Sequence, residues 1–128
     1  MKRSVLAVLA ILGAAALPAR AAVHAWSSNG PFGGPITGLA IDPSNPARLW
    51  AVSFNGGVFR SVDAGAHWTP SIDGLADLTV NVIAVDPLHA SNLLVGTQEG
   101  IFRSTDGGSH WTAGNTGLTD GADIRAIA

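Results

Sequence analysis

Short apolar runs, each closed by turn-forming residues, make up most of the chain after residue 35. In the first stretch, these runs predict four strands, at 37–41, 49–53, 58–61 and 67–70. Asp42-Pro43 ends the first strand, because proline has no N–H to donate to a sheet, and glycine, asparagine and aspartate mark the other gaps. The runs have no sustained helical period, so the pattern predicts an all-β fold.

The same order of runs returns about 43 residues later. Residues 36–43 recur as 80–87, residues 57–61 as 100–104, and residues 61–68 as 104–111. Four short strands in a repeat of about 40 to 45 residues are typical of one β-propeller blade. Blades bury both faces against their neighbours, which accounts for strands that do not alternate strictly between apolar and polar residues.

We therefore predict a partial β-propeller: two four-stranded antiparallel blades with one extra strand at each end, after an N-terminal signal helix. Two blades leave unpaired sheet edges, so we expect a truncated chain, whose partners include further blades of the full-length protein, rather than an oligomer. The predicted segments are a signal peptide at 1–21, a strand closing a blade at 22–35, a first blade at 36–79, a second blade at 80–123, and the first strand of a third blade at 124–128.

The N-terminus has the order of features found in a secretory signal. A basic start at residues 1–3 precedes an apolar run at 5–17, and Ala19-Arg20-Ala21 supplies a small-x-small cleavage pattern. An uncleaved membrane anchor is the alternative, but this run falls short of the roughly 20 residues that a spanning helix needs. We expect a secreted or periplasmic protein, with no stable membrane insertion after cleavage.

Composition narrows the classes of partner. Residues 22–128 carry four arginines, no lysine and nine acidic residues, a formal charge of −5. A nucleic-acid binder normally has a basic footprint, so no nucleic acid is expected. Asp63 and Asp106 each offer one carboxylate, where calcium needs several oxygen ligands, and His67 and His110 have no neighbours at metal-ligand spacing. We therefore expect no metal and no cofactor.

Two octapeptides share the pattern Ser-x-Asp-x-Gly-x-x-Trp, at 61–68 and 104–111, in register with the repeat. The pair resembles the Asp-box, or bacterial neuraminidase, repeat. This repeat occurs in the propellers of sortilin-type domains, photosystem II assembly factors, xyloglucan-active glycoside hydrolases and sialidases. The resemblance covers residues 26–128 and implies a structural role for the motif residues, which are Ser61, Asp63, Gly65, Trp68, Ser104, Asp106, Gly108 and Trp111.

The motif also makes physical sense as a hairpin clamp. Its aspartates can accept hydrogen bonds from turn amides, its glycines can take positive φ where the chain reverses, and its tryptophans offer a large apolar face to cover the turn. Arg60 and Arg103 stand in Phe-Arg-Ser, which is similar to part of a sialidase signature. Because each arginine leads directly into an octapeptide, we interpret both as strand residues.

Catalytic residues are not assigned. The chain has no tyrosine, which excludes a sialidase nucleophile among these residues. The resemblance to xyloglucan-active enzymes implies a catalytic aspartate before a Gly-Gly pair after the second strand, but Asn55 occupies that place, and Glu99 in the second repeat has no evident partner. Whether the protein is an enzyme stays open. We expect a non-catalytic binding or assembly module, with the N-terminal fragment of a secreted xyloglucanase-like or sialidase-like glycoside hydrolase as the alternative.

In a propeller, the loops from second to third strand share one end with the links between blades. In this chain that end holds amides, carboxylates and an aromatic side chain, a mixture suited to a glycan or to a polar edge of a protein partner. Functional variation tends to occur in such loops on a rigid scaffold. The predicted ligand contacts are Phe54, Asn55 and Glu99.

Overall fold

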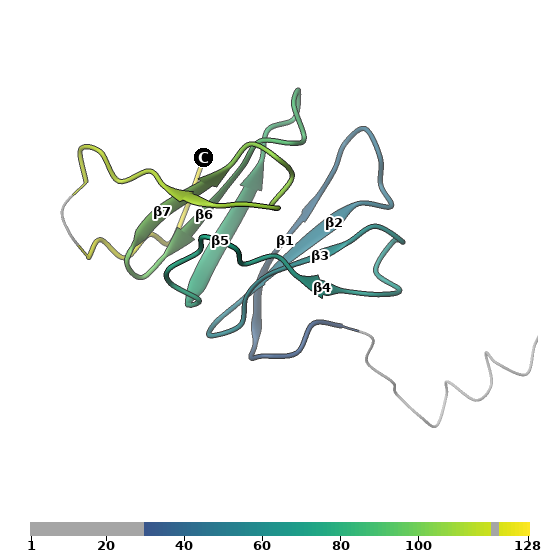
Figure 1. Ribbon diagram of the computed structural model, residues 1–128, viewed down its shortest axis with the longest axis horizontal. Coiled ribbons are helices and arrows are strands. Elements are labelled where there is room, and N and C mark those ends of the chain that lie inside the picture. Colours follow the sequence, from purple (N-terminus) through teal and green to yellow (C-terminus); the bar gives the residue numbers. More distant parts are fainter. Residues whose placement is uncertain (1–29, 119–120) are drawn as a thin grey trace, which may run out of the picture.

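The computed structural model describes residues 30–118 and 121–128 of the chain (Figure 1). Eight strands form two separate four-stranded sheets, and each sheet follows the order of its strands along the chain. The first sheet contains β1 (Ile36–Ile41), β2 (Leu49–Ser53), β3 (Gly57–Ser61) and β4 (Thr69–Pro70), and the second contains β5 (Val80–Val85), β6 (Leu93–Thr97), β7 (Gly100–Ser104) and β8 (Thr112–Ala113). The predicted all-β fold with two four-stranded antiparallel blades is confirmed.

The two sheets, here blade 1 and blade 2, have equivalent hydrogen-bond registers. Ala40 pairs with Trp50 in blade 1, and Ala84 pairs with Leu94 in blade 2. Each inner pair of strands also has a register shift at its start, after Ile36 and after Val80. The fourth strand begins at Thr69 rather than at the predicted residue 67, because the N–H of His67 donates to the Asp63 carboxylate within the turn instead of to β3.

One hydrophobic core lies between the blades, where β1 and β2 pack on β5 (Figure 1). Blade 1 contributes Trp50, Val52 and Val58, which are all fully buried. Blade 2 contributes the face of its sheet that packs against blade 1, which includes the buried Leu93 and Val95. Burying a valine or leucine side chain is worth about 1.5 to 3 kcal/mol, so this contact between blades is a major source of stability.

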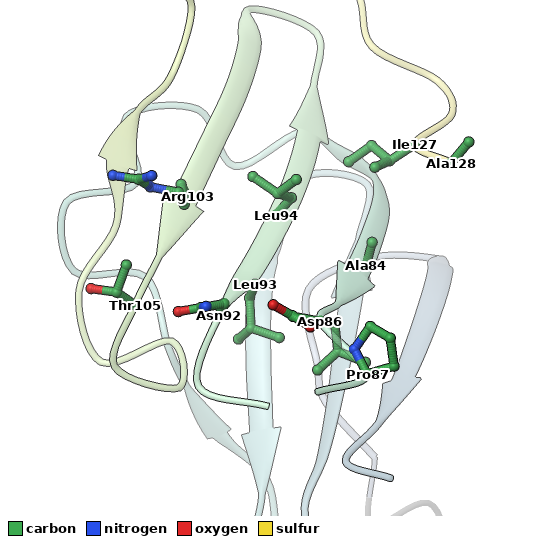
Figure 2. A pocket seen from close by; sticks show the side chains of 11 residues that line it. Ala84, Asp86, Pro87, Asn92, Leu93, Leu94, Arg103, Thr105, Ile127 and Ala128 are labelled. Atoms are coloured by element: carbon green, nitrogen blue, oxygen red, sulfur yellow. The ribbon is translucent and has the colours of Figure 1, made fainter. Parts of the chain in front are cut away.

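The outer faces of the pair are more open. Leu39 and Ile41 project from blade 1 with 66% and 55% of their surface exposed. On the far side of blade 2, a cleft of about 400 Å³ is lined by Ala84, Leu94 and Arg103, with Ile127 across from the strands (Figure 2). Each blade therefore keeps one face uncovered by the other.

Of the two predicted extra strands, the first lies mostly outside the described residues, and the second does not form. The strand placed at 22–35 lies mostly outside the described residues, and residues 30–35 form no strand. Residues 124–128 form no strand either: Ile124 donates its N–H to the Thr97 carbonyl, and the Asn81 side chain donates to the Ile124 carbonyl, but no ladder follows. β1 and β5 each form a ladder with the next strand of their own sheet. Among the described residues, none provides such a strand for 124–128. The predicted signal peptide at 1–21 lies outside the described residues.

Candidate functional site

The two ends of the blades differ in chemistry. One end, here the loop end, holds the β2–β3 turn at 54–56, the β6–β7 turn at 98–99 and the link between blades at 71–79. The other end, here the motif end, holds the β3–β4 turn at 61–68 (turn 1) and the β7–β8 turn at 104–111 (turn 2). All three predicted ligand contacts lie at the loop end.

Asp77 joins the loop end across the blade boundary. Its Oδ1 accepts the N–H of Thr79 at 2.9 Å, which closes a tight turn just before β5. Its Oδ2 accepts the N–H of Glu99 at 3.0 Å, although Glu99 is 22 residues further along the chain in blade 2. Both oxygens of this half-buried carboxylate therefore hold backbone donors in place.

The same short segment also reaches the β2–β3 turn of blade 1. The Thr79 hydroxyl donates to the Asn55 side-chain oxygen at 3.3 Å, and Thr79 forms an isolated bridge with Phe54. Segment 77–79 therefore brings Asn55 and Glu99, predicted separately from two repeats, to either side of one turn.

The side chains at the loop end remain accessible. Phe54 has 39% of its surface exposed, while Asn55 and Glu99 are also exposed. Asn55 has φ 86°, a left-handed conformation that asparagine tolerates better than most residues, so its amide stands at the apex of the turn. The Glu99 N–H is also held by the Thr97 hydroxyl at 3.0 Å, which fixes the backbone from which its carboxylate projects.

This arrangement suits hydrogen bonding better than acid–base chemistry. An exposed amide, a carboxylate and an aromatic ring can together contact the hydroxyls and apolar faces of a sugar. Asp77 accepts one backbone N–H on each carboxylate oxygen, which is a structural use of this carboxylate. Among the described residues, no group of three or more histidine and acidic side chains is placed to hold a metal ion.

Sequence reasoning did not single out Asp77 or Thr79. Asp77 counted only as one of several carboxylates in the loops, and its link to the Glu99 backbone depends on how the blades pack. A local signal does exist, because Asp-Leu-Thr directly before a strand is a sequence that forms an aspartate-closed turn. No comparable sequence pattern indicates that Asp77 also bonds to the Glu99 backbone in blade 2.

At the motif end, turn 1 closes through its aspartate. Asp63 accepts the N–H of His67 at 2.8 Å and the Ser61 hydroxyl at 2.8 Å, and it lies 2.6 Å from Nδ1 of the His67 ring. The His67 side chain, followed by the His67 N–H and the Ser61 hydroxyl, lowers the pKa of Asp63 to about 2. The ionised carboxylate is therefore part of the turn. Gly65 completes it with φ 93°.

Turn 2 repeats these bonds. Asp106 accepts the Ser104 hydroxyl at 2.7 Å and the His110 N–H at 2.9 Å, which lower its pKa below the ordinary value. The His110 ring faces a different carboxylate, Asp73 of the link between blades, at 3.3 Å.

Turn 2 also docks on blade 1. The indole N–H of Trp50 donates to the Gly107 carbonyl at 2.9 Å, and the Ser71 hydroxyl donates to the Gly108 carbonyl. In return, the indole N–H of Trp111 donates to the Ser71 carbonyl at 2.7 Å, and Trp111 is only 1% exposed. The turn therefore serves as a latch between blades as well as a hairpin closure.

Arg60 and Arg103, interpreted as strand residues, do lie on β3 and β7. Arg60 lies on the face of blade 1 that is turned toward blade 2, and Arg103 lies on the equivalent face of blade 2. Each arginine lines a cleft on that face. Arg60 borders a cleft of about 460 Å³ between β4 and turn 2, and Arg103 borders the open cleft of blade 2 (Figure 2).

No helix among the described residues is long and apolar enough to cross a membrane.

No protein-family model matches the chain, and no curated protein matches it. Among solved structures, an ancestral GH74 enzyme is similar over 80% of this chain and 13% of its own length, at 27% identity and a TM-score of 0.68. The GH74 xyloglucanase from Xanthomonas campestris is similar over 65% of this chain and 15% of its own, at 23% identity and a TM-score of 0.56.

YCF48 from Cyanidioschyzon merolae is also similar, over 65% of this chain and 24% of its own, at 22% identity and a TM-score of 0.52. The chain thus spans less than a quarter of the length of each of these three structures. All three are propeller proteins, and the two antiparallel sheets found here match their blades. The chain therefore folds as two neighbouring blades of a β-propeller.

Proposed function

We propose that this chain supplies two blades of an extracytoplasmic propeller protein, and that its loop end binds glycan without providing a catalytic pair. The observation that carries the proposal is the convergence of Asn55 and Glu99 on segment 77–79. The Asn55 amide oxygen accepts the Thr79 hydroxyl, and the backbone N–H of Glu99 is held by Asp77 and Thr97. Beside the exposed Phe54 ring, the two residues form a preorganised polar surface.

A glycan is favoured over other polar ligands by the comparison at 27% identity, which is with a GH74 enzyme and extends over most of this chain. The likeness to YCF48 is at 22% identity and supports the fold alone. An exported location is favoured by the signal-like order of residues 1–21. Membership of the Asp-box repeat family rests on the two octapeptides and on the bonds that Asp63 and Asp106 make in their turns.

A non-catalytic role is favoured by the state of the carboxylates. Hydrolysis of a glycoside commonly needs two carboxyl groups on either side of the scissile bond. At the loop end Asp77 is engaged by two backbone donors, and the position before Gly56-Gly57 holds an asparagine. Glu99 is then left without a second free carboxylate among the described residues of this site.

The second candidate is a part of a secreted glycoside hydrolase of the xyloglucanase-like kind. The same 27% identity favours it. Because this chain spans 13% of the ancestral GH74 enzyme, the catalytic carboxylates would then belong to other blades, and the loop end would act as a binding subsite. Both candidates place glycan contact on the same three residues.

Titration of the purified protein with xyloglucan oligosaccharides, followed by calorimetry, tests the proposal. We expect Phe54→Ala, Asn55→Ala and Glu99→Gln each to weaken binding by about fivefold or more, since a lost hydrogen bond or stacking contact is worth about 1 kcal/mol. Leu88→Ala, at an exposed apolar residue of the motif end, is the matched control and should bind as the parent does. Binding losses at His67→Ala with no change at Asn55 and Glu99 would move the site to the motif end.

A further inference from the structure

Segment 77–79 belongs to neither blade's sheet, and it makes side-chain contacts with the loop-end turns of both. On one side the Thr79 hydroxyl reaches Asn55 of blade 1. On the other side Asp77 Oδ2 holds the N–H of Glu99 in blade 2. Main-chain bonds from Gly57 to Leu78 and from Gln98 to Thr79 tie the segment to both blades as well, and the Asp77 carboxylate adds the bond that reaches Glu99 itself.

The contact between Asp77 and Glu99 is stronger than an ordinary loop contact. It is a charge-assisted hydrogen bond to a backbone donor, a class about twice as strong as a neutral pair. Asp77 is half-buried as a residue, although its bond to Glu99 lies at the exposed surface. Its other oxygen is fixed by Thr79 at 2.9 Å, which sets the orientation of the carboxylate plane.

We propose that Asp77 is a positioning residue that sets the Glu99 turn against the Asn55 turn, so that the ligand is recognised across the blade boundary. This inference rests on the proposed function of the loop end. Asn55 and Glu99 are separated by the width of the 77–79 turn and by a hydrogen bond on each side. A ligand that contacts both is therefore a chain of linked sugars, and a single sugar engages one of them at a time.

The substitution Asp77→Asn isolates the proposed role. The remaining side-chain oxygen can still accept the Thr79 N–H and keep the tight turn, while the new NH₂ group faces the Glu99 N–H and cannot accept it. Asp73→Asn is the matched control, because Asp73 belongs to the same link between blades but its side chain faces His110 at turn 2.

Two measurements on the full chain test the proposal. Calorimetry with mono-, di- and tetrasaccharide fragments of xyloglucan should show affinity rising with length in the parent, with that rise reduced about fivefold or more in Asp77→Asn and retained in Asp73→Asn. Amide hydrogen exchange by NMR, without ligand, should show faster exchange at Glu99 in Asp77→Asn, because its N–H then has one acceptor, the Thr97 hydroxyl, in place of two. Exchange at Thr79 should be unchanged.

The two proposals fail in different ways. If no fragment binds to the parent, the glycan-binding function is wrong, and Asp77 is then judged by hydrogen exchange alone. If the parent binds glycan but Asp77→Asn keeps both the length dependence and the Glu99 exchange rate, the positioning role is wrong while the glycan-binding function stands. Equal loss of Thr79 and Glu99 protection would also overturn it, because it would show a general loosening of the link between blades.

Discussion

Turns 1 and 2 share the same eight-residue pattern and nearly the same internal hydrogen bonds, yet they differ in what surrounds them. Turn 1 contacts its own blade: Ala64 donates to the Ala47 carbonyl, and Gly65 lies beside Leu49. Turn 2 makes the equivalent bond from Gly107 to Ser91, and it is also held by blade 1. Trp111 is buried, whereas Trp68 is only half-buried.

The difference separates two functions of one motif. Closure of the hairpin is local, because serine, aspartate and glycine bond to one another within four residues. Docking is not local, because it needs a preceding blade with donors in the right places, and Trp50 and Ser71 provide them for turn 2. Among the described residues, no equivalent donor reaches turn 1.

The largest expected effect is at the tryptophans. Trp111→Ala should lower the free energy of unfolding by about 3 to 5 kcal/mol, as expected for truncation of a buried aromatic residue. Trp68→Ala should cost less than half as much, because that side chain keeps contact with water. Urea unfolding followed by circular dichroism measures both. Equal losses would show that docking adds nothing to the motif.

A smaller effect is expected at the donor from blade 1. Trp50→Phe removes the N–H that donates to Gly107, leaving a buried carbonyl unsatisfied at a cost of about 1 to 3 kcal/mol. The smaller ring also leaves a cavity at this fully buried site, which adds to the loss. Trp68→Phe makes the same chemical change at an indole that has no hydrogen bond among the described residues, so it should be nearly neutral. The same unfolding titration compares the two, and a neutral Trp50→Phe would contradict the latch.

The smallest effect concerns acid, and here both turns should lose stability in the same direction. The pKa of Asp63 is lowered to about 2 in the folded protein from an ordinary value of 3.8, so its contribution is complete above about pH 4 and is lost as the pH falls toward 2. The pKa of Asp106 is lowered as well. Both Asp63→Asn and Asp106→Asn should therefore reduce the loss of stability between pH 4 and pH 2.

Unfolding curves from pH 6 to pH 2 measure this slope. Part of the slope should persist in each variant, because the pKa values of Asp42 and Asp86 are also lowered by hydrogen bonds in their own turns. A parent protein whose stability rises as the pH falls from 4 to 2 would show that the carboxylates do not hold these turns.

The sequence predicted the parts of the fold that depend on local pattern. Most strand positions followed from apolar runs ending at residues such as Asp42-Pro43, and the repeat period gave the division into two blades. The loop end was also predicted correctly as the place where Asn55 and Glu99 lie, because equivalent turns of successive blades fall at the same end.

The contacts between blades could not be predicted in the same way. Trp68 and Trp111 occupy identical positions in their octapeptides, and only the presence of a packed neighbour distinguishes them. The bond from Asp77 to Glu99 joins residues that no repeat or motif relates. The missing ladder at 124–128 has the same origin, since a strand-like sequence forms a strand only where a partner supplies hydrogen bonds.

The latch at turn 2 has a consequence for how such repeats can be exchanged. Its acceptors are the main-chain carbonyls of Gly107 and Gly108, which every repeat carries whatever its side chains. Its donors are side chains, and blade 2 has Leu94 and Gly114 where blade 1 has Trp50 and Ser71. A duplicated or recombined blade can therefore dock after blade 1 if its own turn keeps the tryptophan that donates to the Ser71 carbonyl, whereas a blade docked on blade 2 would find neither the indole nor the hydroxyl donor. Two of the three side-chain donors of this latch belong to the preceding blade, so the preceding blade largely decides which neighbours fit.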